Sequence, residues 1–280
     1  MHLLDIPVAA SLMLFVLSFD LVSSKGQKPF FAYSSLFSCV VFITLSVTQD
    51  SNNLPIIIFS SFLILFVFIS LLLHISLKIR EDLFIIAGVV IQVLMYQWLI
   101  DTNNQLTNGD HGLLLSFNNN LSHPDPINLT LSSLGLVFIG LLVRYFFWNS
   151  TLGKRLLVLS FNNSFASSLG ILRYSTILAT SFCASVLLAM SAYLIFTYKG
   201  ILLASSFDIQ MTLLALAIVL TGKHKAIWFY MIMIIVAVLD PLIRSFMQLS
   251  HIAPSLSSIF VGTIIIVYTF RVFSKTPNKH

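Results

Sequence analysis

The stretch LPIIIFSSFLILFVFISLLLHISL, residues 54–77, decides the fold class of this chain. It contains no Asp, Glu, Lys or Arg, and it is longer than the roughly 20 apolar residues that an α-helix needs to cross the hydrocarbon core of a bilayer. Lipid offers no water to the backbone N–H and C=O groups, so a spanning segment pairs them within its own helix. The stretch therefore predicts a membrane-spanning α-helix.

Similar apolar stretches fill the rest of the chain. They lie near 6–23, 30–48, 83–100, 131–149, 171–196, 207–221, 226–247 and 255–272. Together they predict an all-α polytopic membrane protein of about nine transmembrane helices, forming a single domain over 1–280. The stretch 207–221 is short and begins Phe207-Asp208, so a broken or re-entrant helix is an alternative there, which puts the number of spans at about eight to ten.

Composition excludes several other classes of protein. Hydrophobic residues make up 58% of the chain, against about 45–50% in soluble domains. The net charge of +5 comes from basic residues scattered through short loops, which does not favour nucleic-acid binding. Cys39 and Cys183 lie inside apolar stretches and no histidines have metal-ligand spacing, so we expect neither a metal site nor a bound cofactor.

The distribution of Lys and Arg predicts the topology. If the loop with Lys78 and Arg80 is cytoplasmic, alternation of the spans places nearly all of the 15 Lys and Arg on the cytoplasmic side, as the positive-inside rule requires. We therefore expect the N-terminus outside and the C-terminus inside. Arg144 is expected to reach the cytoplasmic interface from its span end. A long outer loop, 101–130, is expected to be ordered only by turns, and an inner loop covers 150–170.

The inner loop has its own pattern. Its apolar residues recur at spacings typical of short helices at the membrane surface: Leu156, Leu159, Phe165 and Leu169. We expect Gly170 to end such a helix, because glycine adopts positive φ without strain. A plain connector is the alternative for this loop.

A family resemblance enters at the inner loop. Residues 153–171 resemble the cytoplasmic segment of the M-type permease subunit of branched-chain amino acid ABC importers, a family that includes urea and short-amide permeases. The matching positions are Gly153, Lys154, Leu156, Asn162, Ala166, Leu169, Gly170 and Ile171. The run from Thr107 through Gly109, Asp110 and Gly112 to Leu113 is similar to the family's Thr-Gly-Gly-Ser-x-Gly-Leu. Fainter similarities lie at Gly26-Gln27 and at 239–244.

The resemblance implies a permease subunit in the bacterial inner membrane. It would form a homo- or heterodimer with a second permease subunit and work with ABC ATPase subunits and an external binding protein, to carry an amino acid-like solute, urea or an amide. Loop 150–170 would be the ATPase-coupling loop. Where the family has charged residues this loop has Leu157, Ser160, Phe161 and Asn163, so we expect apolar packing to dominate the contact, with Phe161 and Phe165 as anchors.

The chain is not expected to be an enzyme. ATP hydrolysis needs a glycine-rich phosphate loop that ends in Lys and a hydroxyl residue. The pairs Gly153-Lys154 and Gly222-Lys223 are followed by Arg155 and His224 instead. We therefore expect ATP to bind to the partner subunits.

Several polar residues are candidates for a solute pathway. An ionised side chain at mid-membrane costs about 2.5–3.5 kcal/mol or more, which draws attention to Asp20 and Asp240, although Asp240 could simply pair with Arg244. Gln92 is uncharged but lies deep in its span. The full candidate set is Asp20, Gln92, Thr107, Gly109, Asp110, Gly112 and Asp240.

Two alternative functions stay open. A membrane-embedded enzyme or ion-coupled carrier could use Asp20, Asp240 and the outer-loop histidines His111 and His123. A permease-like subunit that has lost transport and serves a structural role is the other, because glycines of the family pattern near 221–225 are missing.

Overall fold

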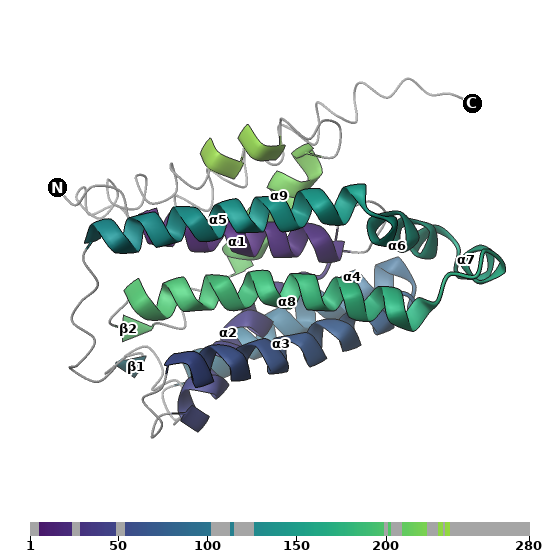
Figure 1. The fold of residues 1–280 in the computed structure, drawn as a ribbon. Helices are drawn as coiled ribbons and strands as arrows, with labels where there is room; N and C mark the ends of the chain where they lie inside the picture. The colour runs from purple at the N-terminus through teal and green to yellow at the C-terminus, as the bar shows by residue number, and fades with distance from the viewer. Residues whose placement is uncertain are drawn as a thin grey trace.

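The computed structural model describes residues 6–23, 29–48, 54–101, 113–114, 126–198, 201–202, 209–222, 229–231 and 233–235. In this part of the chain, five helices are long and apolar enough to cross a membrane (Figure 1): α1 (Ile6–Ser23), α3 (Leu54–Ser76), α4 (Glu81–Ile100), α5 (Pro126–Asn149) and α8 (Arg173–Tyr198). The prediction of a helical, membrane-embedded protein is confirmed to this extent.

The other helices are shorter. They are α2 (Tyr33–Thr48), α6 (Thr151–Phe161), α7 (Asn163–Ser168) and α9 (Ile209–Gly222). Residues 229–231 and 233–235 are also helical, while the remainder of the predicted span 226–247 and all of 255–272 lie outside the described residues. The first seven predicted spans therefore all coincide with helices.

Two details of the predicted outer loop were wrong. Strand β1 (Leu113–Leu114) pairs antiparallel with β2 (Ile201–Leu202), so the loop is not ordered by turns alone. In addition, α5 begins at Pro126, about five residues earlier than expected. Proline suits the first turn of a helix because its ring presets φ and its missing N–H has no helical partner there.

Helix α1 lies at the centre of the bundle, where it contacts α5, α8 and α9. Figure 1 shows α5 running beside it. Almost all described side chains of α1 are buried, as expected of a helix that is apolar on every side. At Gly140 of α5, an added Cβ would lie 2.7 Å from Leu14 Cδ2. Glycine at this position thus lets the leucine side chains of α1 pack directly against the backbone of α5.

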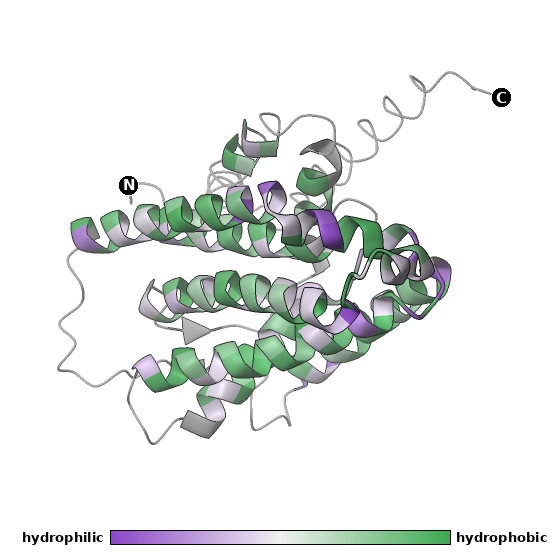
Figure 2. Cartoon of the chain, turned by 45° about the vertical axis from the view of Figure 1, so that its right-hand side comes forward, coloured by the Kyte–Doolittle hydropathy of each residue, from purple (hydrophilic) through white to green (hydrophobic). Residues whose placement is uncertain are grey.

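The outer helices expose large apolar side chains. Phe59 of α3, Leu94 of α4 and Phe138 of α5 are 62%, 64% and 62% exposed. Figure 2 shows hydrophobic residues along the length of these helices. Water-soluble monomers rarely expose so continuous an apolar surface, whereas lipid tails solvate it at no cost.

The two ends of the bundle differ. The turn between α3 and α4, with Lys78 and Arg80, lies at the end that carries α6 and α7, and the β1–β2 pair lies at the opposite end (Figure 1). Lys154 and Arg155 of α6 add to the positive charge of the first end. This asymmetry is the kind that orients membrane proteins.

Candidate functional site

Helices α6 and α7 form a hairpin that projects from one end of the bundle (Figure 1). Helix α6 follows α5 after the single residue Ser150, whose hydroxyl donates to the Phe147 carbonyl at 2.7 Å. The buried residues of α6 are Gly153, Leu156 and Leu159. We call α6, α7 and their flanking residues 150–172 the hairpin.

Glycine is required where α5 turns into α6. A Cβ added to Gly153 would lie 2.5 Å from the Phe147 carbonyl oxygen. That contact is with backbone and cannot be relieved by rotating a side chain. The angle at which the hairpin leaves α5 therefore depends on Gly153.

Replacing Gly153 with alanine is expected to cost about 1–3 kcal/mol of unfolding free energy, the usual cost of overpacking. Gly135 of α5 is the matched control, because a Cβ added there would meet nothing within 4 Å. Gly135→Ala should be neutral or slightly stabilising, since alanine favours helix. Denaturant unfolding of the purified proteins in detergent measures the change in unfolding free energy for both variants. Equal stabilities for the two variants would contradict the account of this turn.

Helix α7 is fixed at both ends by its own sequence. The Asn162 side-chain oxygen accepts hydrogen bonds from the backbone N–H groups of Ser164 and Phe165, at 3.0 and 3.1 Å, which is an N-cap. At the other end Gly170 has φ of +70°, and the Ile171 N–H donates to the Ala166 carbonyl at 3.0 Å. The predictions of short helices in 150–170 and of a glycine ending one of them are confirmed.

The outer side of the hairpin carries unpaired apolar surface. Phe161 is 74% exposed, and Phe165 and Leu169 are each 56% exposed. Ala166, by contrast, is fully buried. The hairpin also carries exposed polar and basic residues, among them Lys154, Arg155 and Ser164. An exposed apolar patch with a polar rim is typical of a docking surface.

A buried ion pair ties α1 to α5. The Asp20 carboxylate accepts hydrogen bonds from Arg144 Nε at 2.7 Å and from Trp148 Nε1 at 3.1 Å. Arg144 also donates to the Tyr230 hydroxyl at 2.8 Å, and its guanidinium lies 3.9 Å from the Phe229 ring centroid. Asp20 is 3% and Arg144 9% exposed. Arg144 is thus engaged inside the bundle by Asp20 and Tyr230, and its expected position near the membrane interface stays a prediction.

A second polar cluster lies where α2 begins. The Ser35 hydroxyl donates to the Gln92 side-chain oxygen at 2.8 Å, and the Ser34 hydroxyl lies 3.4 Å from the same oxygen. The Ser34 backbone N–H donates to the Thr212 hydroxyl at 3.0 Å. Three helices, α2, α4 and α9, thus meet around Gln92, which is 1% exposed.

The sequence predicted only part of the buried ion pair and of the polar cluster around Gln92. Gln92 and Asp20 were candidates, whereas Arg144, Trp148, Ser34, Ser35 and Thr212 were not. A detectable signal was present for the serines, because Ser34, Ser35 and Ser38 recur on one side of α2. Thr107, Gly109, Asp110, Gly112 and Asp240 lie outside the described residues.

In the described residues, no three His, Cys, Asp or Glu side chains come together as a metal site would require. Both cysteines are free thiols. The chain matches no protein-family model, no curated protein and no solved structure with which it was compared.

Proposed function

We propose that this chain is the permease subunit of an ABC importer of the bacterial inner membrane, carrying a small polar solute with energy from separate ATPase subunits. The observation that supports this most strongly is the hairpin, with its capped helix α7 and its exposed Phe161 and Phe165. Short helices with aromatic anchors fit grooves on partner proteins. A plain connector between spans has no need of either feature.

The packing of the hairpin suits a part that transmits motion. Helix α6 contacts both α5 and α8, and Gly153 fixes its angle to α5. At the start of α8, the Arg173 guanidinium donates to the His74 carbonyl at 3.0 Å, which links α8 to the end of α3. A push on the hairpin by an ATPase would therefore move three spans together, as rigid-body coupling requires.

The proposal includes about nine spans, with the N-terminus outside and the C-terminus inside. Its support is the positive charge at the hairpin end, where Lys78, Arg80, Lys154 and Arg155 lie. Helix α9 is described over Ile209–Gly222, and the broken or re-entrant alternative for 207–221 stays part of the proposal.

Single cysteines at Asn119 and Ser164 test this topology. In a background with Cys39 and Cys183 changed to alanine, an impermeant thiol reagent on intact cells is expected to label Asn119→Cys and to leave Ser164→Cys unlabelled. Ser164 is exposed on α7, so it should label once the cells are broken. Labelling of Ser164→Cys but not Asn119→Cys in intact cells would reverse the proposed orientation.

The partner ATPase is the most direct test of the function. Affinity purification of the tagged chain in mild detergent should recover vanadate-sensitive ATP hydrolysis, since this chain has no phosphate loop of its own. Absence of any ATP hydrolysis in eluates from cells that express the natural partners would remove the importer from consideration.

An ion-coupled carrier is the second candidate, and the buried Asp20–Arg144 pair favours it. Charged groups inside membrane bundles often serve proton or ion coupling. The two functions separate in an uptake assay: collapse of the ion gradients with ionophores would stop a carrier, whereas depletion of ATP would stop an importer.

A further inference from the structure

Two cations come together where α3 ends and α8 begins. Arg173 is the first residue of α8, and its guanidinium donates to the carbonyl of His74, in the last turn of α3, at 3.0 Å. Lys78 follows His74 by four residues, and both cations lie within electrostatic reach of the His74 ring. We call Lys78, Arg173, His74 and Tyr174 the basic cluster.

No described carboxylate pairs with the two cations. Neither of the salt bridges formed among the described residues includes Lys78 or Arg173. The Arg173 Nε atom has no hydrogen-bond partner in the described part of the chain, and Lys78 is exposed. Arginine carries five N–H donors, so the contact with His74 leaves donors over for an anion. The cluster therefore has both the charge and the hydrogen-bond capacity to hold one.

The cluster lies at the level of the lipid headgroups. Helices α3 and α8 are both long and apolar enough to cross a membrane, so their ends reach the interface. The Tyr174 ring stacks on the His74 ring, with centroids 5.7 Å apart and planes inclined by 17°, and Tyr174 is 70% exposed. Tyrosine is enriched at this depth because its ring is apolar and its hydroxyl is polar.

An exposed apolar stripe leads from the cluster along α8. Tyr174, Leu178 and Phe182 recur every four residues, which places them on one side of the helix. Leu178 is 46% and Phe182 53% exposed. The Phe182 ring also meets Phe62 and Phe66 of α3, with centroids 5.5 and 6.5 Å apart. The stripe therefore follows the line along which α3 and α8 pack together.

The length of the stripe matches one leaflet of a bilayer. Phe182 follows Arg173 by nine residues, which is about 14 Å along a helix. Half of a hydrocarbon core about 30 Å thick is nearly the same distance. A phospholipid with its phosphate at the basic cluster would thus lay an acyl chain along the stripe.

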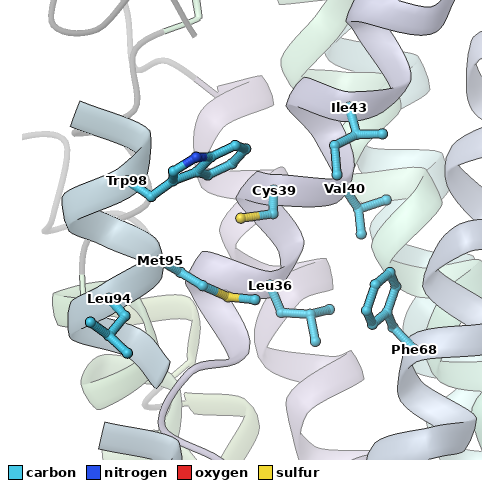
Figure 3. A pocket seen from close by; sticks show the side chains of 8 residues that line it. All are labelled: Leu36, Cys39, Val40, Ile43, Phe68, Leu94, Met95 and Trp98. Atoms are coloured by element: carbon cyan, nitrogen blue, oxygen red, sulfur yellow. The ribbon is translucent and has the colours of Figure 1, made fainter. Parts of the chain in front are cut away.

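The apolar cavity between α2, α3 and α4 has a different chemistry (Figure 3). Its volume is about 330 Å³, and its lining residues are all apolar, with Phe68, Met95 and Trp98 among them. Trp98 lies in the last turn of α4, at the end of that helix away from Lys78. A charged headgroup would lose its hydration there without gaining an opposite charge, so the cavity is not its site.

We propose that the basic cluster and the stripe form a binding site for an anionic phospholipid. Arg173 and Lys78 hold its phosphate, and an acyl chain lies against Leu178 and Phe182. The planar fork of an arginine matches phosphate oxygens, and basic pockets between spans on the cytoplasmic side bind anionic headgroups. The site does not depend on the transport function proposed above.

The test uses the purified full chain in detergent, titrated with dioleoyl phosphatidylglycerol or with dioleoyl phosphatidylcholine, a zwitterion with the same acyl chains. Phosphatidylglycerol should raise the thermal unfolding temperature in a saturable manner, because a ligand that binds only the folded state stabilises it. Phosphatidylcholine should raise it much less. Replacing both Lys78 and Arg173 with glutamine should weaken the apparent affinity for phosphatidylglycerol by about 30-fold, the usual effect of two cations near an anionic membrane surface.

The matched control removes the same charge from the hairpin. Lys154 and Arg155 are both exposed, and replacing both with glutamine should leave most of the affinity for phosphatidylglycerol. Because Arg173 also contacts α3, the double variant of the cluster could fail to fold. Lys78→Gln alone then takes its place, since Lys78 is exposed, and it should weaken binding by about fivefold.

Three results would overturn the proposal. Equal stabilisation by the two lipids would show that the headgroup charge is not recognised. Equal weakening in the Lys154→Gln/Arg155→Gln variant would indicate a general attraction to the basic end of the bundle. A rise of the same size with inorganic phosphate alone would indicate a site for a free anion, with no part for the acyl chain.

Discussion

Replacing Asp20 with alanine is expected to lower the unfolding free energy by about 3–5 kcal/mol, the usual effect of breaking a buried ion pair from one side. The carboxylate accepts two hydrogen bonds, from Arg144 and Trp148. Without it, the Arg144 guanidinium stays buried with Tyr230 and the Phe229 ring as its remaining contacts among the described residues. Unfolding of the purified protein in mixed micelles measures the loss.

Two controls separate this effect from a general loss of charge. The pair Arg80–Asp82 is exposed, with side chains 82% and 74% accessible, so Asp82→Ala should cost less than about 1 kcal/mol. Replacing Asp20 with leucine together with Arg144 with methionine should recover most of the stability, because no buried charge is then left alone. If Asp20→Ala is as mild as Asp82→Ala, the pair does not hold α1 to α5.

Much of the fold could be predicted because the membrane simplifies the problem. A stretch such as 54–77 has to be helical wherever it meets lipid, and α3 (Leu54–Ser76) follows it almost residue for residue. The α5 boundary was missed because Pro126 was taken as a loop residue, when it serves equally well in the first turn of a helix.

Local features of the site could also be predicted. Gly170 ends α7 through its positive φ, a property of the residue itself. The contacts of Asp20 could not be predicted, since Arg144 is 124 residues away. The same holds for Ser34 and Thr212, which are 178 residues apart. Side-chain spacing describes one helix face and does not tell which other helix packs against it.

Replacing the exposed aromatic residues of the hairpin with aspartate is expected to release the proposed ATPase partner. Phe161 and Phe165 are exposed, so replacing both with aspartate should leave insertion and folding intact. A buried aromatic anchor contributes about 2 kcal/mol or more to a protein interface, so loss of even one should weaken binding by roughly 30-fold. Uptake driven by ATP should fall with it.

Ser164 and Ser167 provide the matched control for charge. Both are exposed on α7, and changing both to aspartate adds the same charge to the hairpin without removing an aromatic side chain. This variant should bind the ATPase much more tightly than the Phe161 and Phe165 variant. Equal loss in the two variants would indicate charge repulsion and not lost packing.

The measurement that tests the importer proposal most directly is vanadate-sensitive ATP hydrolysis recovered with the tagged chain in detergent, per mole of chain. We expect the wild type and the Ser164→Asp/Ser167→Asp variant to recover it and the Phe161→Asp/Phe165→Asp variant to lose nearly all of it while remaining folded. Full recovery with the folded Phe161→Asp/Phe165→Asp variant would contradict the role of the hairpin as the ATPase contact.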